Sequence, residues 1–541
     1  MSKVKQIIFK SYWTLRWIAL SLLWRSAQLL TTFAVFFLTF QTIRLWLIST
    51  VTASPLIILG LVGSSALIAY VWFIVIFPII RDALMGDRAG DSHGSARFAD
   101  SKDISQVNTD AGFILGLALA NKRKDNRQLK TKKHVLISAP TGTGKGTGLV
   151  IPNLLTYPGS MIVLDIKGEN YQVTARRRRD LGQKVFVLDP FGVTGRSDRF
   201  NWLSFLDVQS DDIVGDAAML ADMLVFDDGD SSDPYWNDSA RDLIRGLIAH
   251  VASDRHFGEK TIAEVRRILT MPAKELDEVF RTMSRSDSAH GLVARSANAF
   301  MGKAEKDRSG VLSGAIRHTS FLDDPRIARS VAGDDMNFRM FKREPCTLYL
   351  IIPPDRLAAY CRYVRAIFGI ALSGMAREPT VPKIPVIFLL DEFPQLGHMA
   401  AIENGISLMR GYGVQFVTII QDLSQLKGVY KKWQTFLANS TSVFFGTTDF
   451  DTAKYLSNTL GSSTISVESI SRSMSEFGSE SGNVTTSETG RLLMTPDEIR
   501  TLRGDLAIVL ASGAPPLLVQ RTPYYQDKSM VGLYDKNPMQ A

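Results

Sequence analysis

Cysteine is scarce in this chain, and acidic residues are missing from its first part. Only two cysteines, Cys346 and Cys361, occur in 541 residues, and neither has Cys or His neighbours at the spacing of a zinc site. The sequence therefore excludes a disulfide framework and a structural zinc module, and it fits a reducing compartment. Residues 1–80 contain no Asp or Glu but six Lys or Arg.

The basic excess of the chain is concentrated at its N-terminus. The formal net charge is +8, from 62 basic and 54 acidic residues. When the six basic residues of 1–80 are set aside, 56 basic residues remain against the same 54 acidic ones. The rest of the chain is thus nearly neutral, and its bulk charge does not indicate nucleic-acid binding. Two local clusters, 122–133 and 176–179, are strongly basic; phosphates of nucleic acid or lipid, or simply solvent, would accommodate them.

Two long apolar stretches predict an N-terminal membrane anchor. We expect transmembrane helices at about 26–47 and 55–80, because each stretch can cross a hydrocarbon core about 30 Å thick. Basic residues lie before the first uncharged run, 26–43, and after the second, 55–80, and only Arg44 lies between these two runs. By the positive-inside rule, this pattern predicts a multi-pass membrane protein with both termini in the cytoplasm.

A phosphate-binding loop follows a strand-like run at His134–Ala139. Its sequence is Pro-Thr-Gly-Thr-Gly-Lys, and the segment after it can form a helix as far as Leu155. In such a strand–loop–helix arrangement, glycines let backbone N–H groups point at phosphate oxygens, and Lys145 reaches the β- and γ-phosphates of ATP. We predict that the nucleotide is bound by Thr141, Gly142, Thr143, Gly144, Lys145, Gly146 and Thr147.

The residues expected to hold Mg²⁺ and activate water lie in two places. Gly146 stands where the phosphate-binding loop usually has Ser or Thr, so Thr147 is the nearest hydroxyl that could replace the usual Mg²⁺ ligand. The apolar run Val386–Leu390 ends in Asp391 and Glu392. Carboxylates at the end of a buried parallel strand lie where α/β sheets bind ligands. Asp391 can hold Mg²⁺, and Glu392 can orient or deprotonate the attacking water.

Strand-like runs alternate with helical segments over most of the chain, which predicts an α/β fold with a mostly parallel sheet. Gln421 ends one of these runs and suits a sensor of the γ-phosphate or the water; the alternative is a polar residue that simply leaves a strand. The expected strands are 134–139, 161–165, 184–189, 347–352, 386–390, 414–420, 443–445 and 506–511.

Between the two halves of this α/β region, the apolar spacing of three and four residues predicts only helices. We expect an all-α insertion domain at 210–322 and, because 462–490 is rich in Ser, Thr, Glu and Gly, a flexible surface loop there. The predicted organisation is an anchor, two parts of a nucleotide-binding domain around the insertion, and a short tail: 1–90, 91–209, 210–322, 323–525 and 526–541.

Several phrases of this sequence resemble those of the type IV secretion system coupling proteins of the TraG/TraD (Vir-type) family. The resemblance covers nearly the whole chain. One departure is Asn201-Trp202-Leu203-Ser204, where the family usually has Asn-Pro-Leu-Asp. The matching phrases are GSARFA (94–99), GTGKGTGLVIPNLL (142–155), VLDIKGE (163–169), VFVLDPF (185–191), DPYWNDSARDLI (233–244), LLDEFPQLG (389–397), RGYGVQF (410–416), IIQDLSQL (419–426) and RLLMTPDEI (491–499).

The resemblance implies a RecA-like P-loop ATPase of the bacterial inner membrane that assembles as a homo-hexamer. It implies that ATP hydrolysis with Mg²⁺ drives the transfer of substrates into a type IV secretion channel. The implied partners are the channel proteins and the cargo, which is a relaxase-bound single-stranded DNA, an effector protein or both. The residues leave two alternatives open: an FtsK-like DNA translocase, and a docking receptor that binds ATP without hydrolysing it.

The resemblance also assigns an arginine finger to Arg410 through the phrase RGYGV. Such a side chain would reach the phosphates bound by a neighbouring subunit and meet the negative charge that develops during hydrolysis. The sequence position suits this role, since Arg410 follows a helical stretch and precedes a turn into the next strand. The alternative is an arginine that caps the C-terminus of that helix, where a cation is favourable by about 0.3–1 kcal/mol.

Overall fold

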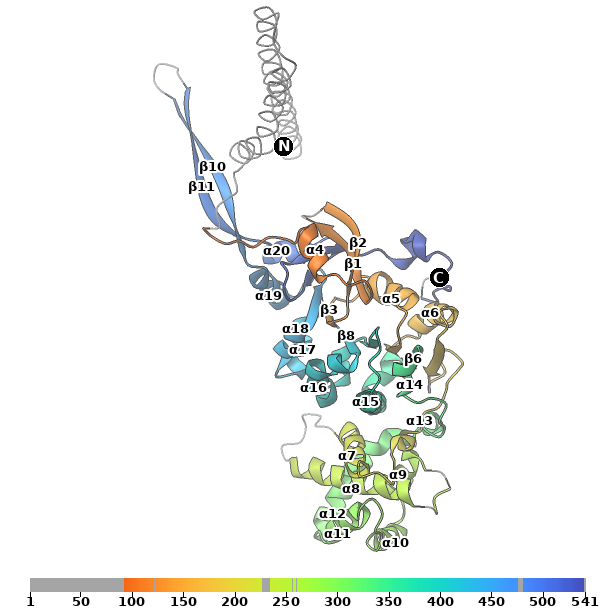
Figure 1. The fold of residues 1–541 in the computed structure, drawn as a ribbon. Helices are drawn as coiled ribbons and strands as arrows, with labels where there is room; N and C mark the ends of the chain where they lie inside the picture. The colour runs from red at the N-terminus through yellow and green to blue at the C-terminus, as the bar shows by residue number, and fades with distance from the viewer. Residues whose placement is uncertain are drawn as a thin grey trace, which may run out of the picture. The chain divides into compact units, whose positions relative to one another are not determined.

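The computed structural model describes residues 92–120, 123–225, 234–254, 256–258, 260–474 and 480–539. The chain divides into two compact units, Met1–Gly90 and Asp91–Ala541, and the described residues all belong to the second. Figure 1 shows this unit as a large sheet with its flanking helices and a separate group of helices.

One eleven-stranded sheet organises the second unit, in the order β2-β1-β13-β12-β9-β3-β8-β7-β4-β6-β5. Each of the eight strands expected from the sequence is present, which confirms those predictions. The strands of this sheet are β1 (Phe113–Ala120), β2 (Arg123–Thr131), β3 (His134–Ser138), β4 (Met161–Asp165), β5 (Lys184–Leu188), β6 (Cys346–Ile351), β7 (Val386–Leu390), β8 (Val414–Ile420), β9 (Ser440–Phe444), β12 (Leu506–Leu510) and β13 (Leu517–Gln520).

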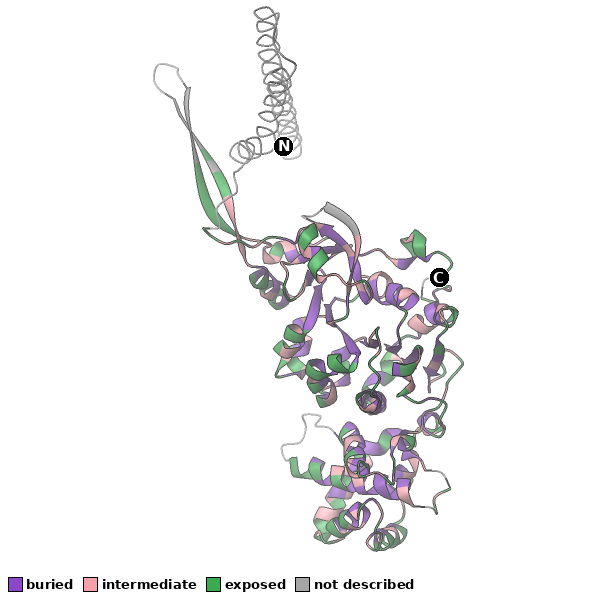
Figure 2. Cartoon of the chain, viewed as in Figure 1, coloured by how far each residue is buried: buried purple, intermediate pink, exposed green. Residues whose placement is uncertain are grey.

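The seven strands from β9 to β5 are parallel to one another and form the core of the nucleotide-binding region. Strand β7 illustrates why a strand in this position can be an unbroken run of apolar residues. Val386, Phe388 and Leu390 pack into one hydrophobic cluster, whereas Ile387 and Leu389 pack into another on the opposite face. Both faces of the sheet are covered at β7, so every residue along this strand is apolar. Figure 2 shows the resulting buried strands with helices around them.

The two faces of the parallel sheet are covered by different helices. The short π-helix η2 (Gly146–Val150) and the helices after β3 and β4 contribute to one hydrophobic cluster, and the helices after β6, β7 and β8 contribute to the other. The helices of this part of the chain are α4 (Ser101–Val107), α5 (Ile151–Thr156), α6 (Glu169–Asp180), α14 (Met340–Arg343), α15 (Pro354–Arg377), α16 (Ala400–Leu408), α17 (Leu423–Val429), α18 (Trp433–Asn439), α19 (Phe450–Leu460) and α20 (Pro496–Arg500).

An antiparallel extension continues the sheet beyond β9, and of its four strands only β12 was predicted from the sequence. Strand β12 pairs antiparallel with β9, and β13, β1 and β2 follow in turn. Strand β2 contains most of the basic cluster 122–133, whose charges hide its strand character. Because β2 is the edge of the sheet, its Lys and Arg residues also discourage pairing with another chain.

Every described element between β5 and β6 is helical. Figure 1 shows that the helices from α7 to α12 form one group, and α8 packs against α7, α11 and α12. The predicted boundaries of the insertion domain, 210–322, stay a prediction. The helices of this region are α7 (Ile213–Leu224), α8 (Pro234–Ser253), α9 (Ile262–Leu269), α10 (Ala273–Met283), α11 (Leu292–Met301), α12 (Glu305–Thr319) and α13 (Pro325–Ser330).

The prediction of a flexible surface loop at 462–490 is wrong. Strands β10 (Ser462–Met474) and β11 (Glu480–Leu492) form an antiparallel hairpin, and their pairing is continuous from Ser462 opposite Leu492 to Met474 opposite Glu480. The segment has few apolar residues because a two-stranded ribbon outside the main sheet has no core to fill. Its many Ser and Thr residues resemble a loop in composition, although Thr favours extended backbone.

The predicted localisation also needs correction. In the part of the chain that the structure describes, no helix is both long and apolar enough to cross a membrane. The two longest, α8 and α15, carry several charged residues each, whereas a span needs about 20 mostly apolar residues. No span in the described residues therefore supports the prediction of a multi-pass inner-membrane protein with both termini in the cytoplasm. We withdraw this prediction. The two predicted spans, 26–47 and 55–80, lie outside those residues.

Candidate nucleotide-binding site

The phosphate-binding loop connects β3 to η2 at the carboxyl edge of the parallel sheet. Gly142 and Gly144 have φ angles of 79° and 77°, in the left-handed region that other residues avoid, and these two positions let the loop curl. Lys145 immediately precedes η2. The backbone N–H groups at the start of this helix have no partners in the preceding turn, so they can face an anion.

Lys145 lies between the two carboxylates that follow β7. Its Nζ atom is 2.8 Å from Asp391 Oδ1 and 2.7 Å from Glu392 Oε1, and all three side chains are less than one-quarter exposed. Burial lowers the pKa of Lys145, but the two carboxylates more than offset this effect, so the pKa is raised overall. Lys145 is therefore a fixed cation at neutral pH.

Strand order explains why residues far apart in sequence meet here. Strand β8 lies between β3 and β7, and the three strands end side by side at the same edge of the sheet. Gln421 directly follows β8, and its amide nitrogen donates a hydrogen bond of 3.1 Å to Glu392 Oε2. Lys145, Glu392 and Gln421 thus form one hydrogen-bonded chain across the three strand ends.

Glu392 itself adopts an unusual backbone conformation. Its φ angle of 51° is in the left-handed region, where non-glycine residues are uncommon and cost roughly 1–3 kcal/mol. The short helix Phe393–Leu396 starts directly after it, so the chain turns sharply at the end of β7. The strain is concentrated at the residue whose carboxylate contacts both Lys145 and Gln421, which indicates that the position of this carboxylate is important.

A pocket of about 360 Å³ opens beside these residues. Most of the predicted site residues line it: Thr141, Gly142, Gly144, Lys145, Gly146, Thr147, Asp391, Glu392 and Gln421. Thr143 is in the same loop, but its hydroxyl donates to the carbonyl of Pro140 and it does not line the pocket.

Residues at the end of β4 and directly after it complete the pocket. No role was predicted for them from the sequence. Asp165, Lys167 and Glu169 line it together with Asn170. Asp165 is 1% exposed and accepts a hydrogen bond of 2.9 Å from the backbone N–H of Tyr171. Burial raises the pKa of this carboxyl group to about 7, against the opposing effect of backbone hydrogen bonds. The available signal was the three charged residues of DIKGE at the end of a buried strand.

The donor atoms near the loop suit Mg²⁺ bound together with a phosphate. The Asp391 carboxylate and the Thr147 hydroxyl both border the pocket, and Thr147 makes only a weak 3.3 Å hydrogen bond to the Gly144 carbonyl. In the described residues, no group of three or more His, Cys, Asp or Glu side chains could hold a metal. Mg²⁺ needs no such group, because it usually keeps several waters and takes one or two carboxylates plus phosphate oxygens.

Arg410 lies apart from this pocket. It belongs to the 3₁₀ turn Met409–Tyr412, which precedes β8, whereas Gln421 follows the same strand. The seven residues of β8 separate the two positions by about 20 Å. The exposed guanidinium makes no hydrogen bond or ion pair in the described residues, although burial and the charge of Arg410 together lower the pKa of His134 to about 4. Arg410 therefore cannot reach the pocket of its own chain.

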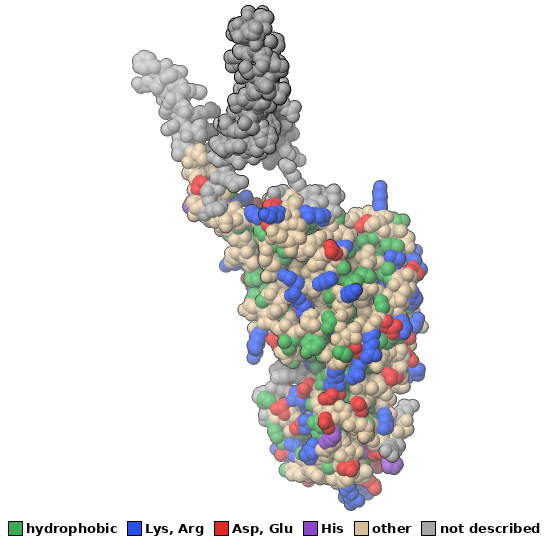
Figure 3. All heavy atoms as spheres, in the orientation of Figure 1, with side chains coloured by type: hydrophobic (Ala, Val, Ile, Leu, Met, Phe, Trp, Pro, Cys, Tyr) green, Lys and Arg blue, Asp and Glu red, His purple; other side chains and the backbone are tan. Residues whose placement is uncertain are grey.

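The basic run 176–179 in α6 is not a uniform charged surface. Arg178 is fully buried, and its guanidinium donates to the carbonyls of Leu154, Tyr157 and Gly159 and to the Thr347 hydroxyl. Arg176 and Arg179 are exposed. Figure 3 shows basic and acidic side chains interspersed over the face that it draws, with no large area of one sign. Both interpretations of the run 176–179, a phosphate-binding surface and a solvated one, are therefore wrong at Arg178.

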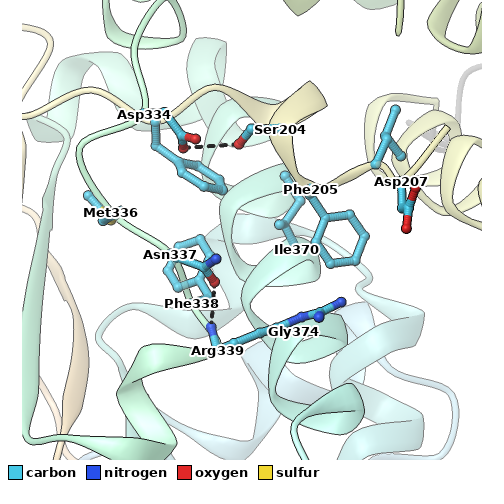
Figure 4. A pocket seen from close by; sticks show the side chains of 12 residues that line it. Ser204, Phe205, Asp207, Asp334, Met336, Asn337, Phe338, Arg339, Ile370 and Gly374 are labelled. Carbon is cyan, nitrogen blue, oxygen red and sulfur yellow. Dashed lines mark hydrogen bonds between the residues drawn. The ribbon is translucent and has the colours of Figure 1, made fainter. Parts of the chain in front are cut away.

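A second cavity, of about 230 Å³, lies away from the phosphate-binding loop (Figure 4). It is lined by apolar side chains such as Phe205 and Ile370 and by polar ones such as Asp207 and Arg339. Ser204, the last residue of the departure from the family's usual phrase, donates a 3.0 Å hydrogen bond to Asp334 at its rim. We assign no chemistry to this cavity.

Comparison with known proteins places this geometry in a family. The profile of the family described as "Type IV secretory system Conjugative DNA transfer" matches residues 98–539. The chain belongs to this family. The match includes the phosphate-binding loop, the helical region, both carboxylates and the strands that carry Gln421 and the antiparallel extension, so it covers the whole described fold almost without remainder.

Curated relatives of this family share about three in ten residues with the chain. Protein VirD4 of Rhizobium radiobacter is 31% identical over 417 residues, which cover 74% of this chain and 58% of the relative. Protein VirD4 of Rhizobium rhizogenes is 28% identical, covering 84% and 69%. Conjugal transfer protein TraG of Escherichia coli is 27% identical, covering 80% and 77%. The match to the first of these relatives thus spans little more than half of its length.

Solved structures of the conjugative coupling protein TrwB have the same fold. The unbound form of TrwBdeltaN70 has a TM-score of 0.59 and 18% identity, over 79% of this chain and 92% of that one. TrwB in complex with ADP and Mg²⁺ has a TM-score of 0.58 and 19% identity, over 79% and 94%. This likeness confirms the predicted α/β fold with a mostly parallel sheet.

Proposed function

We propose that this chain is a coupling ATPase that passes cargo to a type IV secretion channel and uses ATP hydrolysis to drive the transfer. The observation that carries the proposal is the ammonium group of Lys145, which joins Asp391 and Glu392 beside a phosphate-binding loop in a member of the conjugative DNA transfer family. The cargo we propose is relaxase-bound single-stranded DNA, effector proteins or both. TrwB structures in complex with a non-hydrolysable ATP analogue and with ADP and Mg²⁺ support the same nucleotide here.

The residues of the pocket that were predicted from the sequence have distinct parts in the proposed reaction. The loop from Thr141 to Thr147 binds the phosphates through its backbone N–H groups, and Lys145 neutralises the β- and γ-phosphates. Asp391 and Thr147 would hold Mg²⁺, which supplies charge stabilisation on the phosphate oxygens when bound.

Glu392 is proposed as the general base and Gln421 as its partner. One carboxylate oxygen of Glu392 bonds to Lys145 and the other accepts from Gln421, so the carboxylate is held in place by both. When the nucleotide engages Lys145, Glu392 Oε1 loses that partner and becomes available to take a proton from water. Gln421 keeps the carboxylate oriented and links the end of β8 to the state of the phosphate.

Replacing Glu392 with glutamine tests this assignment. We expect nucleotide binding to persist but turnover to fall by about 10²–10⁴-fold, because the amide retains the shape of the side chain and cannot accept the proton. Nucleotide affinity and steady-state ATP hydrolysis would be measured on the same preparation. Glu403→Gln is the matched control, since Glu403, in α16, bonds to His398 and does not line the pocket. Near-normal turnover in Glu392→Gln would remove Glu392 from the mechanism.

Arg410 is proposed to act on the pocket of a neighbouring subunit in a homo-hexamer. Its exposure and its distance from the pocket of its own chain suit this role. We expect Arg410→Ala to turn over ATP poorly, and we expect mixtures of Arg410→Ala with Glu392→Gln protein to recover part of the activity. In such mixtures, an intact pocket on one subunit meets an intact arginine on the next.

Two other outcomes of the mixing experiment are informative. If Arg410 only caps α16, the Arg410→Ala protein will hydrolyse ATP nearly normally and lose a little thermal stability. If Arg410→Ala is inactive and mixing restores nothing, the assignment to the neighbouring subunit is wrong.

A further inference from the structure

Arg521 is an arginine buried against the phosphate-binding loop. It directly follows β13 in the antiparallel extension, and the residue is only 5% exposed. The centre of its guanidinium lies 3.6 Å from the centroid of the Phe445 ring. Its Nη1 atom donates a hydrogen bond of 3.1 Å to the Thr143 carbonyl, and Nη2 donates to the Gly504 carbonyl.

Burying this guanidinium is costly, and its neighbours offset the cost only in part. Its hydrogen-bond acceptors are neutral carbonyls, and its Nε–H group has no acceptor in the described part of the chain. Burial lowers the pKa of Arg521 to about 10, against the raising effect of Asp505, so the group still carries its charge at neutral pH. Burial of a charge without a bonded carboxylate costs free energy. We therefore expect Arg521 to serve a purpose at this position.

Arg521 lies on the outer side of the loop that curls around the phosphates. In such a loop the N–H groups point inwards at the anion and the carbonyls must point outwards. Arg521 supplies the partner for one of these carbonyls, that of Thr143. It also packs along the following turns, because a Cβ atom added at Gly144 or Gly148 would lie 3.9 or 3.5 Å from Nη1.

We propose that Arg521 is a positioning residue for nucleotide binding, which holds the Thr143 carbonyl outwards and thereby keeps the N–H groups of the loop directed at the phosphates. The stacking on Phe445 fixes the guanidinium plane, and the bond to Gly504 ties the loop to the turn between α20 and β12. Arg521 therefore makes the antiparallel extension part of the nucleotide site. This inference deepens the proposed function and rests on it.

Arg521→Met tests the inference in the full-length chain. We expect the dissociation constant for ADP and the KM for ATP to rise by about 10-fold or more, the effect of losing one hydrogen bond from a charged donor. We expect kcat to change little, because Arg521 contacts the loop in the same way before and during the reaction. ADP binding would be measured by calorimetry and turnover by steady-state kinetics.

Two further variants make the result specific. Arg521→Lys keeps the charge but cannot bond to both carbonyls while stacking on Phe445, so it should show an intermediate KM. Arg503→Met is the matched control. Arg503 lies in the turn between α20 and β12 that contains Gly504, and it pairs with Asp505, but its side chain is 72% exposed. We expect wild-type ADP affinity in this control.

The outcomes separate this inference from the function on which it rests. If the wild-type chain binds no ADP, the proposed function fails. If the wild-type chain binds ADP and the folded Arg521 variants bind it equally well, the positioning role is wrong, whatever their thermal stability. Should Arg521→Met not fold, Arg521→Lys decides: a raised KM with an unchanged kcat supports the role, and two unchanged constants overturn it.

Discussion

Replacing Lys145 with alanine is expected to abolish ATP turnover, by at least about 10²-fold, and to abolish cargo transfer with it. Lys145 contacts both Asp391 and Glu392 and is the loop's own cation. Without it, two carboxylates face the site where the phosphates must bind, so the repulsion increases as the attraction is lost. The measurement is steady-state ATP hydrolysis by the purified full-length chain, together with a transfer assay in cells.

The Lys145→Ala protein should remain folded, because the pocket lies at the edge of the sheet and the core residues beneath it are unchanged. Lys132→Ala is a suitable control, since Lys132 is an exposed lysine that donates only to the carbonyl of Lys383. If turnover survives in Lys145→Ala, the pocket is not the hydrolytic site. A variant that fails to accumulate in cells would show that Lys145 also supports the fold.

Replacing Arg178 with methionine is expected to lower the free energy of unfolding by about 3 kcal/mol or more, a large effect for one substitution. Methionine fills much of the space but leaves the carbonyls of Leu154 and Tyr157 and the hydroxyl oxygen of Thr347 without a donor, and the Gly159 carbonyl keeps only the hydrogen bond of 3.3 Å from Gln183. These carbonyls belong to the end of α5 and the connection to β4, so the effect falls on the sheet that carries the pocket. Chemical denaturation of the full-length chain measures it.

The neighbouring variant Arg179→Met provides the control. Arg179 is in the same helix, is exposed and, among the described residues, donates only a 3.4 Å hydrogen bond to the Tyr171 hydroxyl, so its replacement should change stability by less than about 0.5 kcal/mol. Equal stability of the two variants would mean that the desolvation cost of Arg178 cancels its four hydrogen bonds. In that case the run 176–179 would have no special structural position.

The parallel half of the fold and most of the pocket could be predicted from the sequence because they follow one rule. A strand buried on both faces is an unbroken apolar run, and parallel strands end at a shared edge. The polar residues after β3, β7 and β8 therefore had to come close to one another, and Lys145, Asp391, Glu392 and Gln421 do so. The sequence could not show that Glu392 has a left-handed backbone, since nothing in the run DEF requires it.

Two antiparallel parts of the fold, the edge strand β2 and the hairpin of β10 and β11, lack this signal. Strand β2 is an edge strand with charged residues, and the hairpin of β10 and β11 has no core to bury, so the sequence of neither contains an apolar run. The burial of Arg178 and Arg521 was equally hidden. A run of arginines in a sequence indicates charge, whereas only the tertiary structure shows which guanidinium finds carbonyl partners inside the protein.

The most direct test of the central claim is steady-state ATP hydrolysis by the purified full-length chain, with and without single-stranded DNA. The coupling ATPase proposed here predicts measurable turnover that rises when single-stranded DNA is added and disappears in Glu392→Gln. A chain that binds ATP but shows no turnover under either condition would contradict it, and would favour a docking receptor for which ATP is a structural ligand.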